Sequence, residues 1–242
     1  MISILVPALN EEKNLPSTIN NIIEASKLAN ITEIDIIIVD DGSKDDTPKV
    51  IEQFKKHYSF IRSLTHKENM GLGYSLRETI FLAKYDKFLI VPGDNDLSVE
   101  LIKALFVNKD KADLVMSYFL NREIRGRKRN VISTLYNTIY MITFGIFVQY
   151  INGPCAFSSS IAQSLDLKAK RFSIAVELII KMMRTGCTYY EIGDFLQKGL
   201  EGSTSLSFKN LIEVIHSYFR LFYEVKFLNK DKYKFFPSRV YR

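Results

Sequence analysis

Short apolar runs alternate with longer amphipathic stretches along the first 120 residues of the chain. Runs that are apolar throughout and bounded by turn residues are typical of strands buried on both faces of a parallel sheet. Residues 36–39 and 88–91 are such runs, and the sequence predicts strands at residues 2–6, 34–39, 60–65, 87–91 and 112–118. Between them, helical periodicity predicts helices at residues 14–28, 46–57 and 72–84. This alternation indicates an α/β fold, with a doubly wound, mostly parallel sheet flanked by helices.

The second half of the chain contains a long uncharged stretch. Residues 130–165 include no Asp, Glu, Lys or Arg. Within them, residues 131–151 have the length of a membrane-spanning helix, roughly 20 residues, but they also carry several Ser, Thr, Asn and Gln residues. We therefore expect a helix at 130–150 that lies in the membrane interface. A single spanning helix at 131–151 and a buried helix that covers the sheet are the alternatives.

A second amphipathic stretch, at residues 211–227, places large apolar residues among Arg220, Lys226 and polar residues. More lysines and aromatic residues follow it. Aromatic anchors beside basic residues are typical of helices that lie on a membrane surface. We expect one folded domain over residues 1–207 and an amphipathic, basic C-terminal appendage at 208–242.

The charge of the chain and its distribution indicate which classes of partner the chain can bind. The chain has 242 residues, a formal net charge of +6 and an isoelectric point near 9.1. Its basic residues gather at 122–129 and 226–242, beside apolar stretches, and no recognised nucleic-acid-binding motif is present. The sequence therefore argues against nucleic acid as a partner. It favours peripheral binding at the cytoplasmic face of a membrane.

Cysteines and histidines predict no metal centre. Cys155 and Cys187 follow no metal-ligand spacing, and we expect both to stay reduced in a cytosolic compartment. His57, His66 and His216 fit no zinc motif and are interpreted as surface or packing residues. The chain begins directly with a predicted strand, which leaves no room for a signal peptide.

Carboxylates follow two of the predicted strands. Asp40 and Asp41 come directly after the second strand, and Asp94 and Asp96 follow the fourth. Ligands of parallel sheets collect at the carboxyl ends of the strands. Carboxylates that converge there repel each other unless a cation compensates their charge. Because hard oxygen ligands suit Mg²⁺ or Mn²⁺, the sequence predicts such a cation, bound together with a diphosphate.

Two further segments lie at the same expected edge. Asn10, Glu11 and Glu12 follow the first strand, where such residues ordinarily cap a helix. Gly71 and Gly73 open the third predicted helix. Their backbone N–H groups can bind a phosphate or their small size can let a ligand approach closely, although a plain loop explains the same glycines.

Taken together, these segments resemble the nucleotide-sugar-binding half of family 2 inverting glycosyltransferases with the GT-A fold. The likeness covers roughly residues 1–120 and rests on the order and spacing of motifs at 7–12, 39–43, 69–73 and 93–97. Within that family the chain is most similar to dolichyl- and polyprenyl-phosphate glycosyltransferases. The residues that repeat their Arg-xxx-Ser-xxx-Asn spacing are Arg129, Ser133 and Asn137.

The resemblance implies a GT-A domain with a nucleotide-sugar half at 1–120 and an acceptor half at 121–207, completed by amphipathic membrane-interface helices. It implies that a UDP- or GDP-sugar is bound by Pro7, Ala8, Asn10, Glu11, Asp40, Asp41, Gly71, Gly73 and Asp94. Asp94 and Asp96 would hold the metal, and Asp96 would also act in the chemistry. Ser98 departs from the family pattern, which usually has glutamine there.

The expected reaction is metal-dependent, inverting transfer of the sugar to a polyprenyl phosphate at the membrane surface. A phosphate acceptor is already an anion near neutral pH, so it needs positive charge rather than a base. We expect Arg129 to act in catalysis as well as in binding. The residues expected to bind the acceptor are Arg122, Arg125, Arg127, Arg129, Ser133 and Asn137.

Two alternatives stay open. A family 2 enzyme that acts on a glycan hydroxyl would need a general base, and Glu177 is the candidate because it lies in the otherwise apolar stretch at 172–183. The same residue can instead be a structural partner for Lys181 at helical spacing. The second alternative is a protein that binds a nucleotide-sugar without catalysis.

Overall fold

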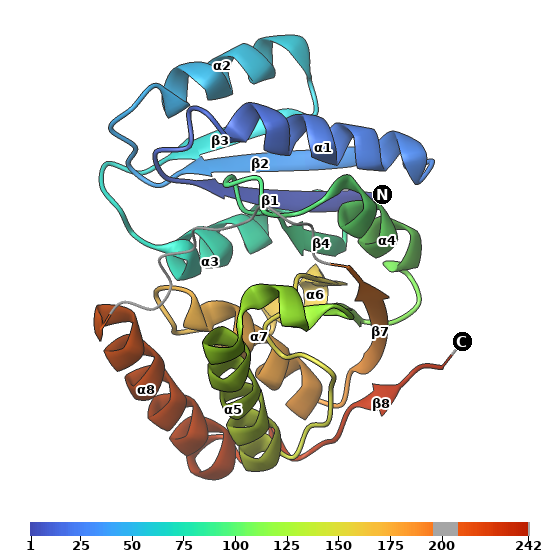
Figure 1. The fold of residues 1–242 in the computed structure, drawn as a ribbon, viewed down its shortest axis with the longest axis vertical. Coiled ribbons are helices and arrows are strands. Elements are labelled where there is room, and N and C mark those ends of the chain that lie inside the picture. Colours follow the sequence, from blue (N-terminus) through green and yellow to red (C-terminus); the bar gives the residue numbers. More distant parts are fainter. Residues whose placement is uncertain (196–207, 242) are drawn as a thin grey trace.

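The protein folds around one twisted sheet with helices on both faces (Figure 1). The computed structural model describes residues 1–195 and 208–241, with all side chains except those of Glu123, Arg125, Arg129 and residues 208–211. The eight strands follow the order β3-β2-β1-β4-β6-β5-β7-β8. Neighbouring strands are parallel, except that β6 runs antiparallel to both β4 and β5.

The strands are β1 (Ile2–Ala8), β2 (Ile34–Asp40), β3 (Ile61–Thr65), β4 (Lys87–Ile90), β5 (Leu114–Phe119), β6 (Cys155–Ser158), β7 (Thr188–Asp194) and β8 (Ser238–Arg239). The helices are α1 (Leu15–Leu28), α2 (Thr47–His57), α3 (Leu72–Leu82), α4 (Val99–Asn108), α5 (Arg127–Phe144), α6 (Ser159–Gln163), α7 (Ser173–Arg184) and α8 (Phe208–Tyr223). A 3₁₀ turn, η1 (Arg122–Arg125), precedes α5, and a π-helical turn, η2 (Glu224–Leu228), follows α8.

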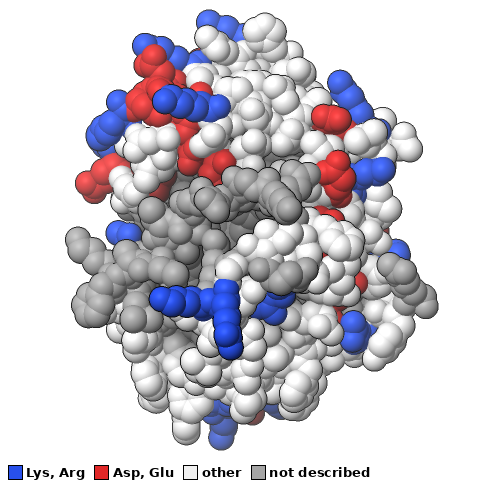
Figure 2. All heavy atoms as spheres, in the orientation of Figure 1, with Lys and Arg blue, Asp and Glu red and all other residues white. Residues whose placement is uncertain are grey.

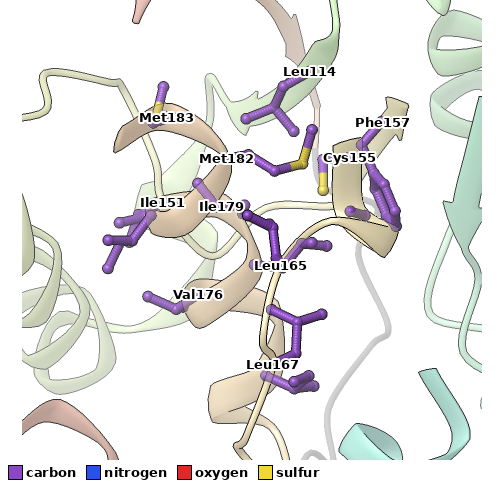
Figure 3. Close-up of a cluster of buried hydrophobic side chains, with 14 of the residues drawn as sticks. Leu114, Ile151, Cys155, Phe157, Leu165, Leu167, Val176, Ile179, Met182 and Met183 are labelled. Carbon is purple, nitrogen blue, oxygen red and sulfur yellow. The ribbon is translucent and has the colours of Figure 1, made fainter. Parts of the chain in front are cut away.

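Both faces of the sheet are buried, as the continuous apolar runs predict. Neighbouring residues of a strand point to opposite faces, so Phe88 joins one apolar cluster and Leu89 the other. Residues of α1, α2 and α4 pack on the face of Leu89, and residues of α3, α5, α6, α7 and α8 on the face of Phe88. Figure 3 shows part of the cluster that contains Phe88. There, Leu114 and Phe157 of the sheet lie beside Ile179 and Met182 of α7.

The expected interfacial helix is shorter than predicted. Helix α5 ends at Phe144 because Gly145 adopts a left-handed conformation, with φ of 62°. The chain then returns to the sheet through residues 145–154. One side of α5 covers the core with Tyr140 and Phe144, which are buried, whereas Ile142 is exposed. Among the described residues, no helix is both long and apolar enough to cross a membrane.

The C-terminal segment contributes to the core. Leu221, Val225 and Tyr233 are buried in the same cluster as α5 and α7, and β8 extends the sheet beside β7. The residues at 208–241, which the sequence suggested as an appendage, therefore cover one face of the domain and one edge of its sheet.

A buried ion cluster joins α7 to this segment. The Nζ atom of Lys181, which is fully buried, lies 2.7 Å from Oε1 of Glu177 and 2.8 Å from Oε1 of Glu224. Lys181 also donates to the carbonyl oxygen of Asp166. Arg220 of α8 donates to Oε2 of Glu177 over 3.1 Å. The two buried carboxylates thus find cationic partners on different elements.

We predict that Lys181→Met lowers the free energy of unfolding by about 3–5 kcal/mol, because it leaves two buried carboxylates without their common cation. Urea denaturation measures this change. The matched control is Lys103→Met on the exposed side of α4, where we expect a change within about 0.5 kcal/mol. If the two variants are equally stable, Lys181 does not hold the cluster.

Candidate functional site

The turns that follow β1, β2 and β4 meet at the carboxyl edge of the sheet, as predicted. Ala8 lies opposite Asp40 in the parallel ladder. The N–H of Asp41 donates to the carbonyl oxygen of Ala8 over 2.9 Å, and that of Gly93 donates to Pro7 over 3.0 Å. The three turns are therefore joined through their backbones.

Side chains bind the first two turns together. Asn10, which has a positive φ of 58°, donates from its N–H to Oγ of Ser43 over 2.9 Å and accepts from the N–H of Lys44 over 2.7 Å. The N–H of Glu11 donates to Oγ1 of Thr47 over 2.8 Å. The amide of Asn10 thus fixes the turn after β2, while the carboxylate of Glu11 accepts from the side chain of Asn14.

The two aspartates at the end of β2 are buried and hydrogen-bonded to backbone N–H groups. Asp40 accepts from the N–H of Ser43 over 2.9 Å. Asp41 accepts from the N–H groups of Met70 and Gly71, each over 2.8 Å, through different carboxylate oxygens. Asp41 therefore holds the loop after β3 against the end of β2, so it shapes the edge whether or not it also touches a ligand.

The structure contradicts the phosphate-binding role expected for the N–H groups of Gly71 and Gly73. The first already donates to Asp41, and the second donates to the carbonyl oxygen of Lys170 over 2.9 Å. A Cβ atom at Gly71 would lie 2.5 Å from that oxygen, and one at Gly73 would lie 2.0 Å from the carbonyl oxygen of Ala169. The glycines are needed because another segment of backbone, rather than a ligand, approaches them.

The turn after β4 carries Asp94 and Asp96 at the surface. Helix α1 supports it, because Thr18 donates to the carbonyl oxygen of Gly93 over 3.1 Å and Asn21 donates to the side chain of Asn95 over 2.9 Å. Loss of solvent around Asp94, together with the negative charges of Asp96 and Glu11, raises the pKa of Asp94 to about 6. The negative charge of Glu11 therefore adds to that of the pair Asp94 and Asp96.

This donor set fits a divalent cation that shares its ligands with a phosphate. No group of three or more His, Cys, Asp or Glu able to hold a metal ion occurs in the part of the chain that the structure describes. Mg²⁺ is ordinarily bound by one or two carboxylates plus substrate phosphates and water, and Asp94 with Asp96 supplies such a pair. Ser98 offers little more, because its hydroxyl already accepts from the N–H of Leu101 over 3.1 Å as the cap of α4.

The arginine-rich turn before α5 brings two of the expected acceptor residues together. Nη2 of Arg122 donates to Oγ of Ser133 over 3.2 Å, and the guanidinium lies 5.2 Å from the centre of the Tyr150 ring. Asn130 donates to the carbonyl oxygen of Arg122 over 2.7 Å. Arg122 is thus oriented from three sides. The side chains of Arg125 and Arg129 lie outside the described residues.

The structure contradicts the acceptor role of Asn137. Its side chain is buried, and Oδ1 accepts from the N–H of Ile151 over 2.8 Å. It points to the core because it lies on the same side of α5 as Tyr140 and Phe144. The loop at 145–154 uses this hydrogen bond, so Asn137 holds the fold rather than an acceptor.

An open cavity of about 610 Å³ lies along another side of α5. Arg127 is at one end of it, and the remaining lining comes from Asn130, Val131, Thr134, Leu135 and Thr138. Of the described residues, those of the Arg-xxx-Ser-xxx-Asn spacing are not among the ones that line this cavity. The signal that could have found it is the helical spacing of Val131, Leu135 and Thr138 beyond Arg127.

Glu177 is engaged by the fold through both carboxylate oxygens. Besides Lys181 and Arg220, it accepts from the N–H groups of Lys168 and Ala169 over 3.0 and 2.7 Å. It is 2 % exposed. The geometry favours the structural alternative that the sequence left open, because Glu177 fixes the segment that contacts Gly71 and Gly73.

His66 is a residue at this edge whose contacts the sequence interpretation missed. Its ring is mostly buried, with Nδ1 2.7 Å from Oδ1 of Asp41 and Nε2 3.1 Å from Oε2 of Glu78. The spacing of histidines gives no hint of this. His66 is nevertheless the first residue after β3, so the argument that selected Asp40 and Asp94 from strand ends would have included it.

We predict that Gly71→Ala destabilises the protein more than Gly126→Ala. Both glycines precede a helix, with φ and ψ of 86° and 157° at Gly71 and 71° and 144° at Gly126. Of the two, only Gly71 has backbone within 3 Å of an added Cβ, whereas no atom of the described residues lies within 4 Å of one at Gly126. The difference in unfolding free energy, measured in urea, is expected to be about 1–3 kcal/mol. If both variants lose the same unfolding free energy, the backbone at 168–171 can move away from the added Cβ without cost, and the prediction is wrong.

Comparison with known proteins gives a consistent set of relatives. The family model described as "Glycosyl transferase family 2" matches residues 3–160. A dolichyl-phosphate beta-glucosyltransferase of Dictyostelium discoideum is 37% identical over 162 residues, which are 61% of this chain and 48% of that protein. An uncharacterized protein of Methanocaldococcus jannaschii is 24% identical over 87% of this chain and 94% of its own length. The chain spans about half the length or less of the dolichyl-phosphate relatives.

Solved structures are similar over nearly the whole chain. Glucosyl-3-phosphoglycerate synthase from Mycobacterium tuberculosis, in complex with Mn²⁺, uridine-diphosphate and phosphoglyceric acid, superposes with a TM-score of 0.65 at 19% identity, covering 92% of this chain and 78% of that one. The same protein is known in complex with Mg²⁺ and uridine-diphosphate. At this level of identity the likeness shows the fold, and it confirms the GT-A architecture expected from the sequence.

Proposed function

The chain belongs to glycosyl transferase family 2, and we propose that it transfers a sugar from a nucleotide-sugar to a polyprenyl phosphate, with inversion, at a membrane surface. The dolichyl-phosphate glucosyltransferases among its relatives support the lipid acceptor. The synthase of similar fold, which binds uridine-diphosphate with Mn²⁺ or Mg²⁺, supports a nucleotide-sugar donor and a divalent metal.

The donor binds at the carboxyl edge, where Pro7, Ala8, Glu11 and Asp40 meet the acidic turn after β4. We assign the metal to Asp94 and Asp96. When bound, the cation neutralises the charge that develops on the departing diphosphate. Asp41 acts indirectly, because it keeps the neighbouring loop in place. Asn10 does the same for the turn after β2.

In the transfer step, a phosphate oxygen of the acceptor forms a bond to the anomeric carbon as the bond from that carbon to the diphosphate oxygen breaks. The configuration at this carbon inverts, and the nucleoside diphosphate leaves with the bonding electron pair. The attacking oxygen is already ionised near neutral pH, so no side chain has to remove a proton.

One observation carries the choice of acceptor. Glu177, the candidate base for a hydroxyl acceptor, is bonded within the fold through both oxygens, whereas Arg127 lines the open cavity along α5 and the side chain of Arg122 is held by Ser133 and Tyr150. This arrangement suits an anion attached to an apolar chain, because arginine binds phosphate through paired hydrogen bonds. A glycan hydroxyl would find no free base at Glu177.

The outer side of α5 and α8 suits a membrane surface. The two helices lie together, with Oγ1 of Thr143 2.7 Å from the hydroxyl of Tyr218. Their exposed apolar residues, with those of the loop after α5 and of η2, are Val131, Ile132, Leu135, Ile139, Ile142, Phe147, Ile212, Ile215, Phe219, Tyr223, Phe227 and Leu228. Figure 2 shows Asp and Glu together with Lys and Arg over the half that carries α1 and α2, and mostly uncharged residues with some Lys and Arg over the half that carries α5 and α8.

We predict that Asp96→Asn lowers the transfer rate at saturating donor by at least about a hundredfold, because the metal loses a charged ligand worth several kcal/mol. The thermal unfolding midpoint is expected to stay within a few degrees of the wild type, since the side chain is exposed. The matched control, Asp231→Asn, removes an acid that is 83% exposed far along the chain and should leave the rate unchanged. Near-normal turnover in Asp96→Asn would remove the metal role.

We predict that Arg122→Ala and Arg127→Ala each raise KM for a short polyprenyl phosphate by about tenfold or more, because a hydrogen bond to a charged group contributes about 1.5–3 kcal/mol. KM for the nucleotide-sugar should change less than twofold. Lys128→Ala, an exposed neighbour that does not line the cavity, is the control for local charge. Equal effects on donor and acceptor would refute this division of roles.

A further inference from the structure

We propose that His66 is a positioning residue for the nucleotide-sugar donor, which as an imidazolium ties Asp41 to Glu78 and so holds the loop at 67–71 against the donor edge. The inference rests on the proposed function, because it takes the carboxyl edge as the donor site. His66 does not touch the donor in this proposal. It acts through Asp41.

The geometry requires both ring nitrogens of His66 to donate. Nδ1 lies 2.7 Å from Oδ1 of Asp41, and Nε2 lies 3.1 Å from Oε2 of Glu78. An ionised carboxylate offers only acceptors, and a neutral imidazole carries a single N–H. A neutral ring would therefore bring a lone pair against one of the carboxylates, whereas the imidazolium satisfies both.

The surroundings of the ring favour this charged form. Asp41 faces it from the end of β2, Glu78 faces it from α3, and the ring of Tyr74, also on α3, packs edge-on with centroids 5.1 Å apart. Burial alone would lower the pKa of His66, but the hydrogen bonds to the two carboxylates outweigh it and raise the pKa above its ordinary value. The ionisable side chains that the described contacts place against the ring are thus two carboxylates and a phenol.

The loop at 67–71 depends on the same carboxylate. Asp41 accepts from Met70 and Gly71 as well as from His66. The backbone of Glu68 lies so close to Gly42 that an added Cβ there would be 2.7 Å from its carbonyl carbon. A shift of Asp41 therefore moves the loop and the turn after β2 together, and both border the donor edge.

The direction of the pH effect follows from linkage. Because the folded pKa of His66 is raised, the stabilisation it provides is fully present below the unfolded pKa and is lost as pH rises through the folded pKa. Donor affinity should fall over the same alkaline range. For each unit by which the locked loop raises the pKa of His66, protonation of His66 strengthens donor binding by a factor of about ten.

The test combines histidine titration by NMR with calorimetric binding of UDP- and GDP-sugars in Mg²⁺ between pH 6.5 and 9. We compare wild type, His66→Gln, Glu78→Gln and, as the matched control, His57→Gln, whose exposed ring is hydrogen-bonded to the carbonyl oxygen of Gln53 on its own helix. We expect the wild-type His66 signal to titrate above about 6.5, together with the amide signals of Met70 and Gly71. We also expect donor affinity to fall with the same midpoint.

The variants separate the outcomes. Glu78→Gln should move both midpoints to lower pH, and His66→Gln should bind donor about tenfold more weakly at pH 6.5 with no fall across the range. His57→Gln should behave as wild type. A wild-type pKa at or below the ordinary value, or the same pH profile with and without His66, would overturn the proposal. A different outcome is that neither the wild type nor any variant binds a donor, although the amide signals of the loop still titrate with His66. In that case the proposed function is wrong, and only the coupling between His66 and the loop is supported.

Discussion

The buried carboxylate of Asp41 is the interaction on which the donor edge depends. A buried charge is costly unless hydrogen-bond donors surround it, and Asp41 finds its donors in the loop after β3. Gly71, one of these donors, is also pressed against the segment that Glu177 holds. A single chain of contacts therefore runs from the end of β2 to the ion cluster between α7 and α8, and it links the two halves of the domain.

The acids at the edge consequently fall into two kinds. Asp40 and Asp41 are bonded to backbone N–H groups and give the edge its shape. Loss of solvent, and after it the like charges of Asp96 and Glu11, raise the pKa of Asp94. Like charges that a protein keeps together at a strand end mark the place where a cation lowers the energy of the whole group. The shape of the edge and its chemistry thus come from different carboxylates.

The sequence predicts most of the first half of the fold, because strands such as β2 are continuous apolar runs that end in polar turn residues. It predicts neither β6 nor β7, since these strands pair with segments that are distant in the sequence. The site follows the same rule. Strand-end acids are visible locally, whereas the roles of Gly73, Asn137 and Glu177 depend on partners at Lys170, Ile151 and Lys168, which no local pattern reveals. Helical spacing predicts that Asn137 lies on the same side of the helix as Ser133. In the structure the side chain of Asn137 instead points into the core.

The most direct measurement is a mass-spectrometric search for a lipid-linked sugar after incubating the protein with Mn²⁺, a panel of UDP- and GDP-sugars and a short polyprenyl phosphate. The proposed function predicts a polyprenyl-phosphate sugar of inverted configuration, formed from one donor of the panel and abolished by EDTA. Transfer to a glycan hydroxyl in the same mixture, with the lipid phosphate untouched, would contradict it.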